Sequence, residues 1–388
     1  MLGWRRFGPY HHARADAVRG RLPLVTVELS PVDKVYAWDR VEAADREHRT
    51  VIDGDPDTVP TGVLRERVFT LLDDLSPGVV AVPGWSGHLA RYMLLWGMER
   101  GIPRIVMSAS NRHDMPRSWW GEAVKRRVVS RFQAGLVGGR HGRAYLKALG
   151  IPDSAIFDGY DVVDNDHFAA PSADALSEVQ RQAPARPFFL TSARFIEKKN
   201  LPGLVAAYAA YRALAGDAAA WDLVILGDGP LRDAIVAKCQ ALDVAPFVTL
   251  PGFKQYPELP AWYARAGCFL LGSTTEQWGL VVNEAMAAGL PVIVSDRCGC
   301  AADLVEPGRN GFTLDPLDTQ GWAAAMHRVA HADADRARMA ALSREIIAKW
   351  GPARFADGLA KAVEVARQAK VEAASGLDRA LLGALARR

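Results

Sequence analysis

The chain has 388 residues, of which 49% are hydrophobic and 23% are charged, so we expect a globular protein of two domains rather than one compact core. Its formal net charge of +3 is only mildly basic, and we expect no nucleic acid partner. Neither a secretory signal nor an apolar run near the ~18 residues of a membrane span is recognisable, and the four cysteines lack zinc-binding spacing. We therefore expect a cytoplasmic protein that is either free or peripheral at the inner face of the membrane.

The first half of the chain alternates short apolar segments with helical patterns. The segments typical of covered strands are residues 22–30, 78–85, 104–110 and 133–139. This alternation predicts right-handed βαβ units and a parallel sheet. Ligands bind such sheets beyond the carboxyl ends of the strands, which makes the loops at 83–88 and 108–117 candidate ligand loops.

The segment 116–132 has the most one-sided charge in the chain. It carries five cations against one acid, Glu122, and it begins with the aromatic pair Trp119 and Trp120. A basic helix with aromatic residues is suited to lie on an anionic membrane or to hold an acidic acceptor. The alternative is a solvated amphipathic helix whose valines face the core, and both interpretations remain open here.

A turn-rich connector separates the two halves of the chain. The tract 171–187 has prolines at both ends and is predicted to be a linker. We therefore place the domain boundary near Ala185. From about residue 313 onward the pattern is almost entirely helical.

The stretch 272–295 is predicted to form a loop, a helix and a strand. Its candidate ligand-binding residues lie around the start of the helix. Gly279 precedes an apolar helix, and the N-terminus of a helix offers free amides and partial positive charge to a phosphate. Glu276 lies in the loop before this helix and Glu284 within its first turns; carboxylates accept hydrogen bonds from hydroxyls. Two carboxylates near a helix terminus that can bind phosphate suit a ligand with hydroxyls on both sides of a phosphate, such as a nucleotide sugar.

The motif TEQWGLVVNEAMA at 275–287 resembles the E-x7-E signature of retaining GT-B glycosyltransferases of family 4, and DVVDNDHF at 161–168 resembles their crossover run. The resemblance implies an α/β GT-B fold: two Rossmann-like domains facing each other across a cleft, with a C-terminal helix returning to the N-terminal domain. The expected parts are an acceptor-side domain at 1–185, a donor domain at 186–349 and a returning helical segment at 350–388.

The same resemblance implies roles for the residues of the E-x7-E motif. Glu276 is expected to face the donor sugar and Glu284 the nucleotide ribose. The backbone at Trp278, Gly279 and Leu280 is expected to bind the diphosphate.

Upstream, Arg194 and Lys199 resemble the family's Arg-x4-Lys pair, which neutralises the leaving pyrophosphate. Charge aimed at the phosphate stabilises the transition state as a bound metal does in other enzymes. Together with Glu276, these two residues are the expected catalytic groups. Because no acidic DxD-like run follows a strand, we expect no metal ion and no cofactor.

Further donor contacts are implied in glycine-containing turns. Gly227 belongs to a loop between a strand and a helix of the donor domain, and the backbone of Phe253 and Lys254 is expected to meet the nucleobase. Gly8, in the first loop of the chain, is expected near the donor phosphate.

Candidate acceptor-side residues are histidines of the first half: His11, His88 and His113. Many relatives carry a histidine just after the fourth strand, where this chain has serines, so His88 or His113 is the expected substitute. The alternative for each of the three is an exposed histidine without a role in the site.

These implications predict a retaining, metal-independent glycosyltransferase. It would move a sugar from a UDP- or GDP-sugar to an acceptor hydroxyl of a saccharide, a lipid-linked saccharide or a small molecule, in polysaccharide, glycolipid or glycoconjugate synthesis. A GT-B nucleotide-sugar 2-epimerase and a non-catalytic nucleotide-binding protein are the alternatives. A glycoside hydrolase built on paired carboxylates is disfavoured, because it leaves Arg194 and Lys199 without a role.

Overall fold

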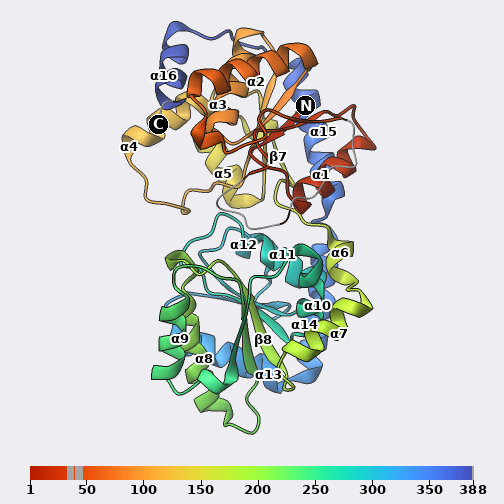
Figure 1. Cartoon of the computed structure of the whole chain (residues 1–388), viewed down its shortest axis with the longest axis vertical. Coiled ribbons are helices and arrows are strands. Elements are labelled where there is room, and N and C mark those ends of the chain that lie inside the picture. Colours follow the sequence, from red (N-terminus) through yellow and green to blue (C-terminus); the bar gives the residue numbers. More distant parts are fainter. Residues whose placement is uncertain (33–38, 40–46, 387–388) are drawn as a thin grey trace. The chain divides into compact units, whose positions relative to one another are not determined.

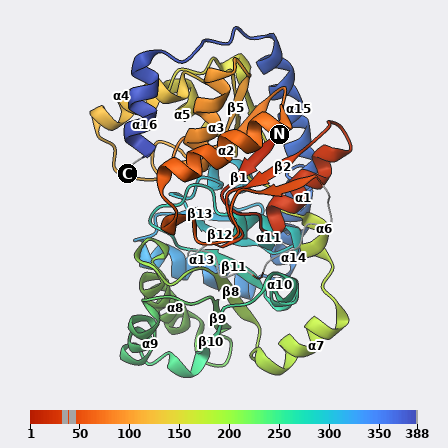
Figure 2. The ribbon, with the colours of Figure 1, turned by 45° about the horizontal axis from the view of Figure 1, so that its top comes forward.

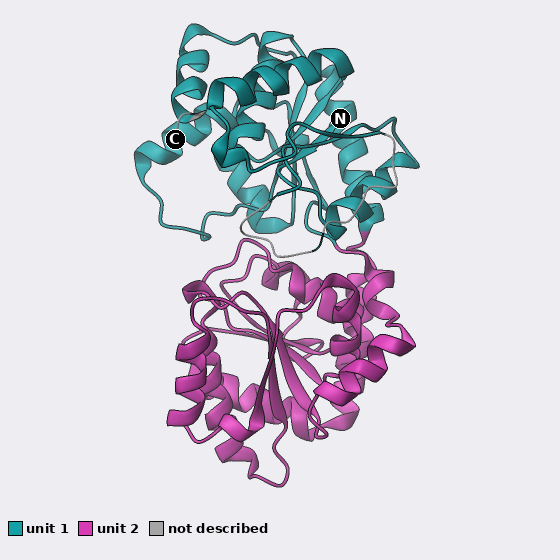
Figure 3. Ribbon diagram, in the orientation of Figure 1, with its two compact units in different colours: residues 1–162, 352–388 teal, residues 163–351 magenta. Residues whose placement is uncertain are grey.

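The structure is a computed structural model that describes residues 1–32, 39 and 47–386, and it divides into two compact units (Figures 1 and 3). Unit 1 comprises Met1–Val162 and Pro352–Arg388. Unit 2 comprises Val163–Gly351. The two expected Rossmann-like domains are therefore present, each with its own parallel sheet.

Unit 1 contains a seven-stranded parallel sheet in the order β3-β2-β1-β4-β5-β6-β7. Its strands are β1 (Leu2–Trp4), β2 (Thr26–Glu28), β3 (His48–Thr50), β4 (Val80–Pro83), β5 (Arg104–Ser108), β6 (Ala134–Val137) and β7 (Ile156–Asp158). Successive side chains of a strand point to opposite faces, and Val80 and Val82 accordingly pack into one core while Ala81 packs into the other. Both faces are covered, which explains why the inner strands β4 and β6 are continuously apolar.

The helices of unit 1 form one layer on each face of this sheet. They are α1 (Pro9–Arg19), η1 (Pro56–Thr58), α2 (Thr61–Leu75), α3 (His88–Glu99), α4 (Trp119–Val129), α5 (Arg140–Ala148), η2 (Asp153–Ala155), α15 (Pro352–Gln368) and α16 (Gly376–Ala386). The expected return of the C-terminal helix is confirmed, because α15 packs on β6 and β7 and on α1 (Figure 2). Gly358 permits this approach, since a Cβ there would overlap the carbonyl oxygen of Asp158.

Unit 2 contains a six-stranded parallel sheet in the order β10-β9-β8-β11-β12-β13. Its strands are β8 (Phe188–Ser192), β9 (Asp222–Leu226), β10 (Val248–Gly252), β11 (Cys268–Leu271), β12 (Val292–Ser295) and β13 (Gly311–Leu314). Its helices are α6 (Asn165–Ala169), α7 (Ala173–Gln182), η3 (Glu197–Lys199), α8 (Leu201–Ala215), α9 (Arg232–Ala241), η4 (Ala245–Phe247), η5 (Tyr256–Glu258), α10 (Leu259–Arg265), α11 (Leu280–Ala287), α12 (Ala301–Leu304), α13 (Thr319–His331) and α14 (Asp333–Ile347). The strand order switches between β8 and β11, where ligands of open α/β sheets bind.

The division between the units falls at Val162 rather than at residue 185. The tract predicted as a linker forms helix α7 instead, capped by the Ser172 hydroxyl, which accepts from the amide of Ala175 at 3.2 Å. Aromatic contacts attach the preceding helix, α6, to unit 2, because the His167 ring stacks on Tyr256 with centroids 4.0 Å apart. The chain therefore enters unit 2 before α6.

Candidate active site

The loops after β8 and β11 bring the two predicted motifs together. These strands are neighbours in the sheet of unit 2, so their carboxyl ends lie at the same edge. The Lys199 ammonium forms an ion pair with one carboxylate oxygen of Glu276. Lys198, which sequence analysis did not single out, lies with its Nζ 3.4 Å from the other oxygen. Two ammonium groups thus face one carboxylate, and the cluster carries a net positive charge.

Backbone contacts fix the lysine loop against the glutamate loop. The amide of Thr274 donates to the carbonyl oxygen of Lys198 at 2.9 Å. Asn200 has a left-handed backbone (φ +51°) and donates from its side-chain amide to the carbonyls of Gly272, at 3.3 Å, and Pro316, at 3.0 Å. The position of Lys199 is therefore set by the backbone geometry of both loops.

Glu276 is an ionised carboxylate in a largely buried place. Its side chain is only 12% exposed. Burial alone would raise the pKa of Glu276, but the neighbouring charges of Lys199 and Lys198 outweigh burial and hold that pKa below its usual value. The carboxylate is consequently available at neutral pH as an acceptor of hydroxyl hydrogen bonds.

Helix α11 begins directly beside this cluster. Gly279 is its N-cap residue, with a left-handed backbone at φ +105°. A Cβ at this position would lie 3.1 Å from Leu271 Cδ2 and 3.6 Å from Glu276 Cγ. The start of α11, with Leu280 as its first residue, therefore lies next to Glu276 and offers helix amides and dipole to an anion.

Glu284 and Trp278, both predicted donor contacts, are held by side chains of unit 2. Glu284 is buried and accepts a hydrogen bond from the Tyr263 hydroxyl at 2.6 Å. The buried indole of Trp278 donates to the side-chain oxygen of Asn283 at 2.9 Å. Tyr263 lies on α10, outside the motif, and sequence analysis missed it because only the packing of α10 against α11 brings its hydroxyl to Glu284.

Gly227 brings its loop against the Arg194 loop. Gly227 has φ +121°, and a Cβ there would overlap the carbonyl oxygen of Ala193, so only glycine permits this packing. Its amide also donates to the carbonyl of Gly252 at 3.0 Å. Arg194 is exposed at this edge of the sheet, and among the described residues it has no partner in an ion pair or side-chain hydrogen bond. Its guanidinium is available to a ligand.

The predicted nucleobase turn presents one exposed side chain and one that is held by hydrogen bonding. Phe253 is 40% exposed. Lys254 donates to the Gln182 side chain at 2.8 Å and lies 5.5 Å from the ring centroid of Trp262. The side chain of Lys254 is thus tied to unit 2, which is consistent with a role for this residue through its backbone.

The acceptor-side candidates lie in unit 1, in three different segments: His11 in α1, His88 at the start of α3 and His113 in the loop after β5. Gly8 donates its amide to Nδ1 of His11 at 3.0 Å, so these two predicted residues are in contact. Burial first, and then the charge of Arg14, lower the pKa of His11 well below its usual value, so the ring is neutral. His88 begins α3, and burial lowers its pKa as well. His113 is exposed in the loop after β5.

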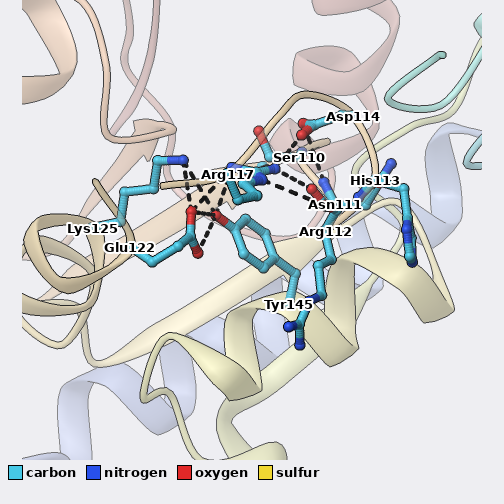
Figure 4. Close-up of polar contacts among 10 residues, drawn as sticks. Ser110, Asn111, Arg112, His113, Asp114, Arg117, Glu122, Lys125 and Tyr145 are labelled. Carbon is cyan, nitrogen blue, oxygen red and sulfur yellow. Dashed lines mark hydrogen bonds and ion pairs between the residues drawn. The ribbon is translucent and has the colours of Figure 1, made fainter. Parts of the chain in front are cut away.

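Figure 4 shows the polar network that holds the loop after β5. Arg117 forms an ion pair with Asp114 and donates to the Tyr145 hydroxyl at 2.7 Å. The hydroxyl of Tyr145 in turn lies 3.0 Å from both carboxylate oxygens of Glu122, and Lys125 Nζ lies 3.0 Å from that carboxylate. Two of the five cations of segment 116–132 are therefore paired locally.

The described residues contain neither a metal-binding cluster nor a membrane-spanning helix. No cluster of three or more histidine, cysteine or acidic side chains is placed to hold a metal ion in that part of the chain. No described helix combines the length and the apolar content that crossing a bilayer requires.

The fold and the site together are those of a GT-B glycosyltransferase. The structure of HepE from Anabaena in complex with UDP and glucose superposes with a TM-score of 0.71 at 17% identity, covering 94% of this chain and 98% of that one. The two parallel sheets of this chain thus follow the arrangement of known GT-B structures.

Sequence comparison identifies the family. Residues 173–345 match the family model of the group 1 glycosyl transferases. The chain is 32% identical over 283 residues to the GDP-mannose-dependent alpha-(1-6)-phosphatidylinositol monomannoside mannosyltransferase of Mycobacterium tuberculosis, covering 69% of this chain and 71% of that protein. It is also 32% identical over 197 residues to the putative colanic acid biosynthesis glycosyltransferase WcaL of Salmonella typhimurium, covering 49% of this chain and 46% of that relative. The chain belongs to the group 1 glycosyltransferases.

Proposed function

We propose that this protein transfers a sugar from a UDP- or GDP-sugar to an acceptor hydroxyl with retention of the anomeric configuration. The observation that carries the proposal is the contact between Lys199 and Glu276 beside the start of α11. This arrangement combines a net positive charge, open helix amides and a buried ionised carboxylate. A sugar diphosphate needs these three elements in one place.

In the proposed reaction, the diphosphate binds at the N-terminus of α11, close to Gly279. Negative charge grows on the phosphate as the sugar–phosphate bond breaks, and Lys199 and the free Arg194 stabilise it electrostatically. Glu276 accepts hydrogen bonds from the donor sugar and favours the positive charge that develops on the ring. The departing phosphate oxygen takes the proton of the acceptor hydroxyl on the same face, which accounts for retention without a separate base. No metal ion is required in this scheme.

The names of the relatives guide the choice of donor and acceptor. The mycobacterial relative is GDP-mannose-dependent and acts on a phosphatidylinositol mannoside, and WcaL belongs to the biosynthesis of a polysaccharide, colanic acid. We therefore propose a saccharide or lipid-linked saccharide as acceptor, and GDP-mannose as the first donor to test, followed by UDP-sugars. Contact of segment 116–132 with a membrane is part of this proposal.

A donor screen tests the proposal. The purified chain is incubated with GDP-mannose, UDP-glucose and related donors, with and without EDTA, and products are followed by NMR. Slow release of free sugar whose anomeric configuration matches the donor, unchanged by EDTA, is expected of a retaining metal-independent transferase. A new epimer of the nucleotide sugar would support the 2-epimerase alternative. A shift of the melting temperature by a nucleotide sugar without any turnover would support the non-catalytic alternative.

A further inference from the structure

Three large apolar side chains are exposed together where α4 begins in unit 1. Met115 is 56% exposed, Trp119 68% and Trp120 67%. The two indole rings stack on each other, with centroids 3.7 Å apart and planes at 27°. We call these three residues the aromatic tip. Clustered exposed apolar side chains on a globular protein commonly mark a surface that contacts a partner.

A polar network holds the segment that carries the aromatic tip. Asp114 and Arg117, whose side chains are only 3% and 14% exposed, form an ion pair one residue to either side of the pair Met115–Pro116. The Arg117 guanidinium also lies 4.5 Å from the ring centroid of Tyr145, and the Ser118 hydroxyl accepts from the amide of Gly121 at 3.2 Å to cap α4. The tip is therefore presented by an ordered base (Figure 4).

The cations of segment 116–132 are largely neutralised within unit 1. Besides Arg117 and Lys125, which are paired as described above, Arg127 contacts Asp378 at 2.9 Å. Arg131 pairs with Glu372 and, at 3.2 Å, with Asp378. These acids lie far along the chain, in and before α16, and α16 lies near α4 in both views (Figures 1 and 2). Four of the five cations in the segment are thus paired with acids of unit 1, which weakens their attraction to an anionic membrane.

Two exposed cations close in sequence to the aromatic tip remain uncompensated. Arg112 and Arg126 are exposed, and neither has an acidic partner among the described residues. The nearby acids Asp114 and Glu122 are both engaged in the inner network. The surface around the tip is therefore apolar and aromatic with a small positive charge, and its acids are already paired.

We propose that the aromatic tip inserts into the interfacial layer of a phospholipid membrane. Tryptophan favours this layer because its ring is apolar and its N–H can bond to head groups or water. Arg112 and Arg126 complement the lipid phosphates. Because the other cations are neutralised, binding depends mainly on apolar insertion and only weakly on the net charge of the lipid. The proposal extends the proposed function by placing a lipid-linked acceptor at the membrane surface, but its test does not depend on turnover.

Vesicle flotation of the full chain tests the inference. Wild-type protein is mixed with vesicles of phosphatidylcholine alone, or of phosphatidylcholine with an equal part of phosphatidylglycerol, at low and high salt. We expect binding to both, with little loss at high salt. The double variant W119A/W120A should bind at least about tenfold less, since it removes two large apolar side chains. R112A/R126A should lose binding only on the anionic vesicles, by a few-fold.

Matched controls separate insertion from misfolding. Leu377→Ala removes another apolar side chain of unit 1, 66% exposed, and should leave flotation unchanged. The melting temperature and donor hydrolysis of W119A/W120A should equal those of wild type, because neither tryptophan is assigned to the donor site.

Three results would overturn the proposal. They are absence of wild-type binding to both kinds of vesicle, equal binding by W119A/W120A, and binding confined to anionic vesicles at low salt. Stacking of a soluble acceptor saccharide on the tip, detected as quenching lost in W119A/W120A without any flotation, would assign the tip to carbohydrate instead. None of these results bears on whether the protein transfers sugar, which the donor screen decides separately.

Discussion

The loop after β5 in unit 1 and the loop after β11 in unit 2 occupy equivalent places, at the carboxyl end of a central strand, but they are held differently. The first is tied by side chains, with Arg117 bonded to Asp114 and Tyr145. The second is tied by backbone contacts, such as that of Thr274 with Lys198, and by the left-handed backbone of Gly279. In the second loop, a single carboxylate, Glu276, receives two ammonium groups, those of Lys198 and Lys199.

This difference explains why one loop is recognisable as a motif and the other is not. A loop fixed by backbone geometry needs glycine and charged residues at set spacings, whereas a loop fixed by side chains can recruit partners from anywhere in the chain. The unit 2 loop is accordingly expected to govern chemistry, and the unit 1 loop to govern stability and the presentation of α4.

The largest expected effect is that of Lys199→Ala on turnover. Removing a cation aimed at the leaving phosphate should lower the rate by about 100- to 1000-fold, while thermal unfolding shows a folded protein. Lys349→Ala is the matched control, because this lysine of unit 2 is 69% exposed and lies 3.8 Å from Glu345 at the surface. Near-normal turnover of Lys199→Ala would remove the leaving-group role from this residue.

Gly279→Ala should weaken nucleotide-sugar binding by roughly tenfold or more. The added Cβ would crowd Leu271, would lie in van der Waals contact with the Glu276 side chain and would strain a backbone at φ +105°. We expect a cost of about 1–3 kcal/mol in the free energy of unfolding. Gly308→Ala is the control, because its φ of +78° imposes similar strain while a Cβ there has open space. Equal binding losses in both variants, measured by calorimetry, would mean that strain rather than the close approach matters.

Tyr145→Phe should destabilise unit 1 without affecting donor binding. The hydroxyl bonds to both Arg117 and Glu122, and its loss leaves charged groups undersatisfied, so we expect about 1–3 kcal/mol in the free energy of unfolding by urea. Tyr92→Phe removes a single bond to the carbonyl of Thr61 at 2.9 Å and should cost less. A smaller loss at Tyr145 than at Tyr92 would contradict the importance of the network.

The smallest effect is expected for Lys198→Ala, on the acid side of the pH–rate profile. Lys198 helps to lower the pKa of Glu276, so its removal should move the acid limb to higher pH. In wild type, the contribution of ionised Glu276 to the free energy of unfolding is complete above the ordinary pKa of a glutamate in the unfolded chain. Because the pKa of Glu276 is lower in the folded protein, this contribution is lost as the pH falls through that lower value. Lys349→Ala again serves as control. A shift toward lower pH, or none, would show that Lys198 does not influence Glu276.

The alternation of strand and helix patterns predicted the α/β class. The resemblance carried by the spaced motifs implied the returning C-terminal helix and a common site for Lys199 and Glu276. The sequence did not predict Tyr263 as the partner of Glu284, or Lys198 as a second cation. The charge of segment 116–132 was visible, but the pairing of Arg127 and Arg131 with Asp378 was not, because these residues lie about 250 positions apart in the sequence. Such pairings arise only from tertiary packing, as does the attachment of α6 to unit 2.

The division of unit 1 into Met1–Val162 and Pro352–Arg388 has a consequence for biosynthesis. One face of its sheet is closed by Phe355, Ala356 and Leu359 of α15, all buried in a core shared with β1 and β6. A ribosome delivers these residues only after the whole of unit 2 has been made. Although domains usually fold in the order of their synthesis, the unit that begins the chain is here the last to be completed, and a chain released before residue 352 would expose an apolar sheet face to chaperones.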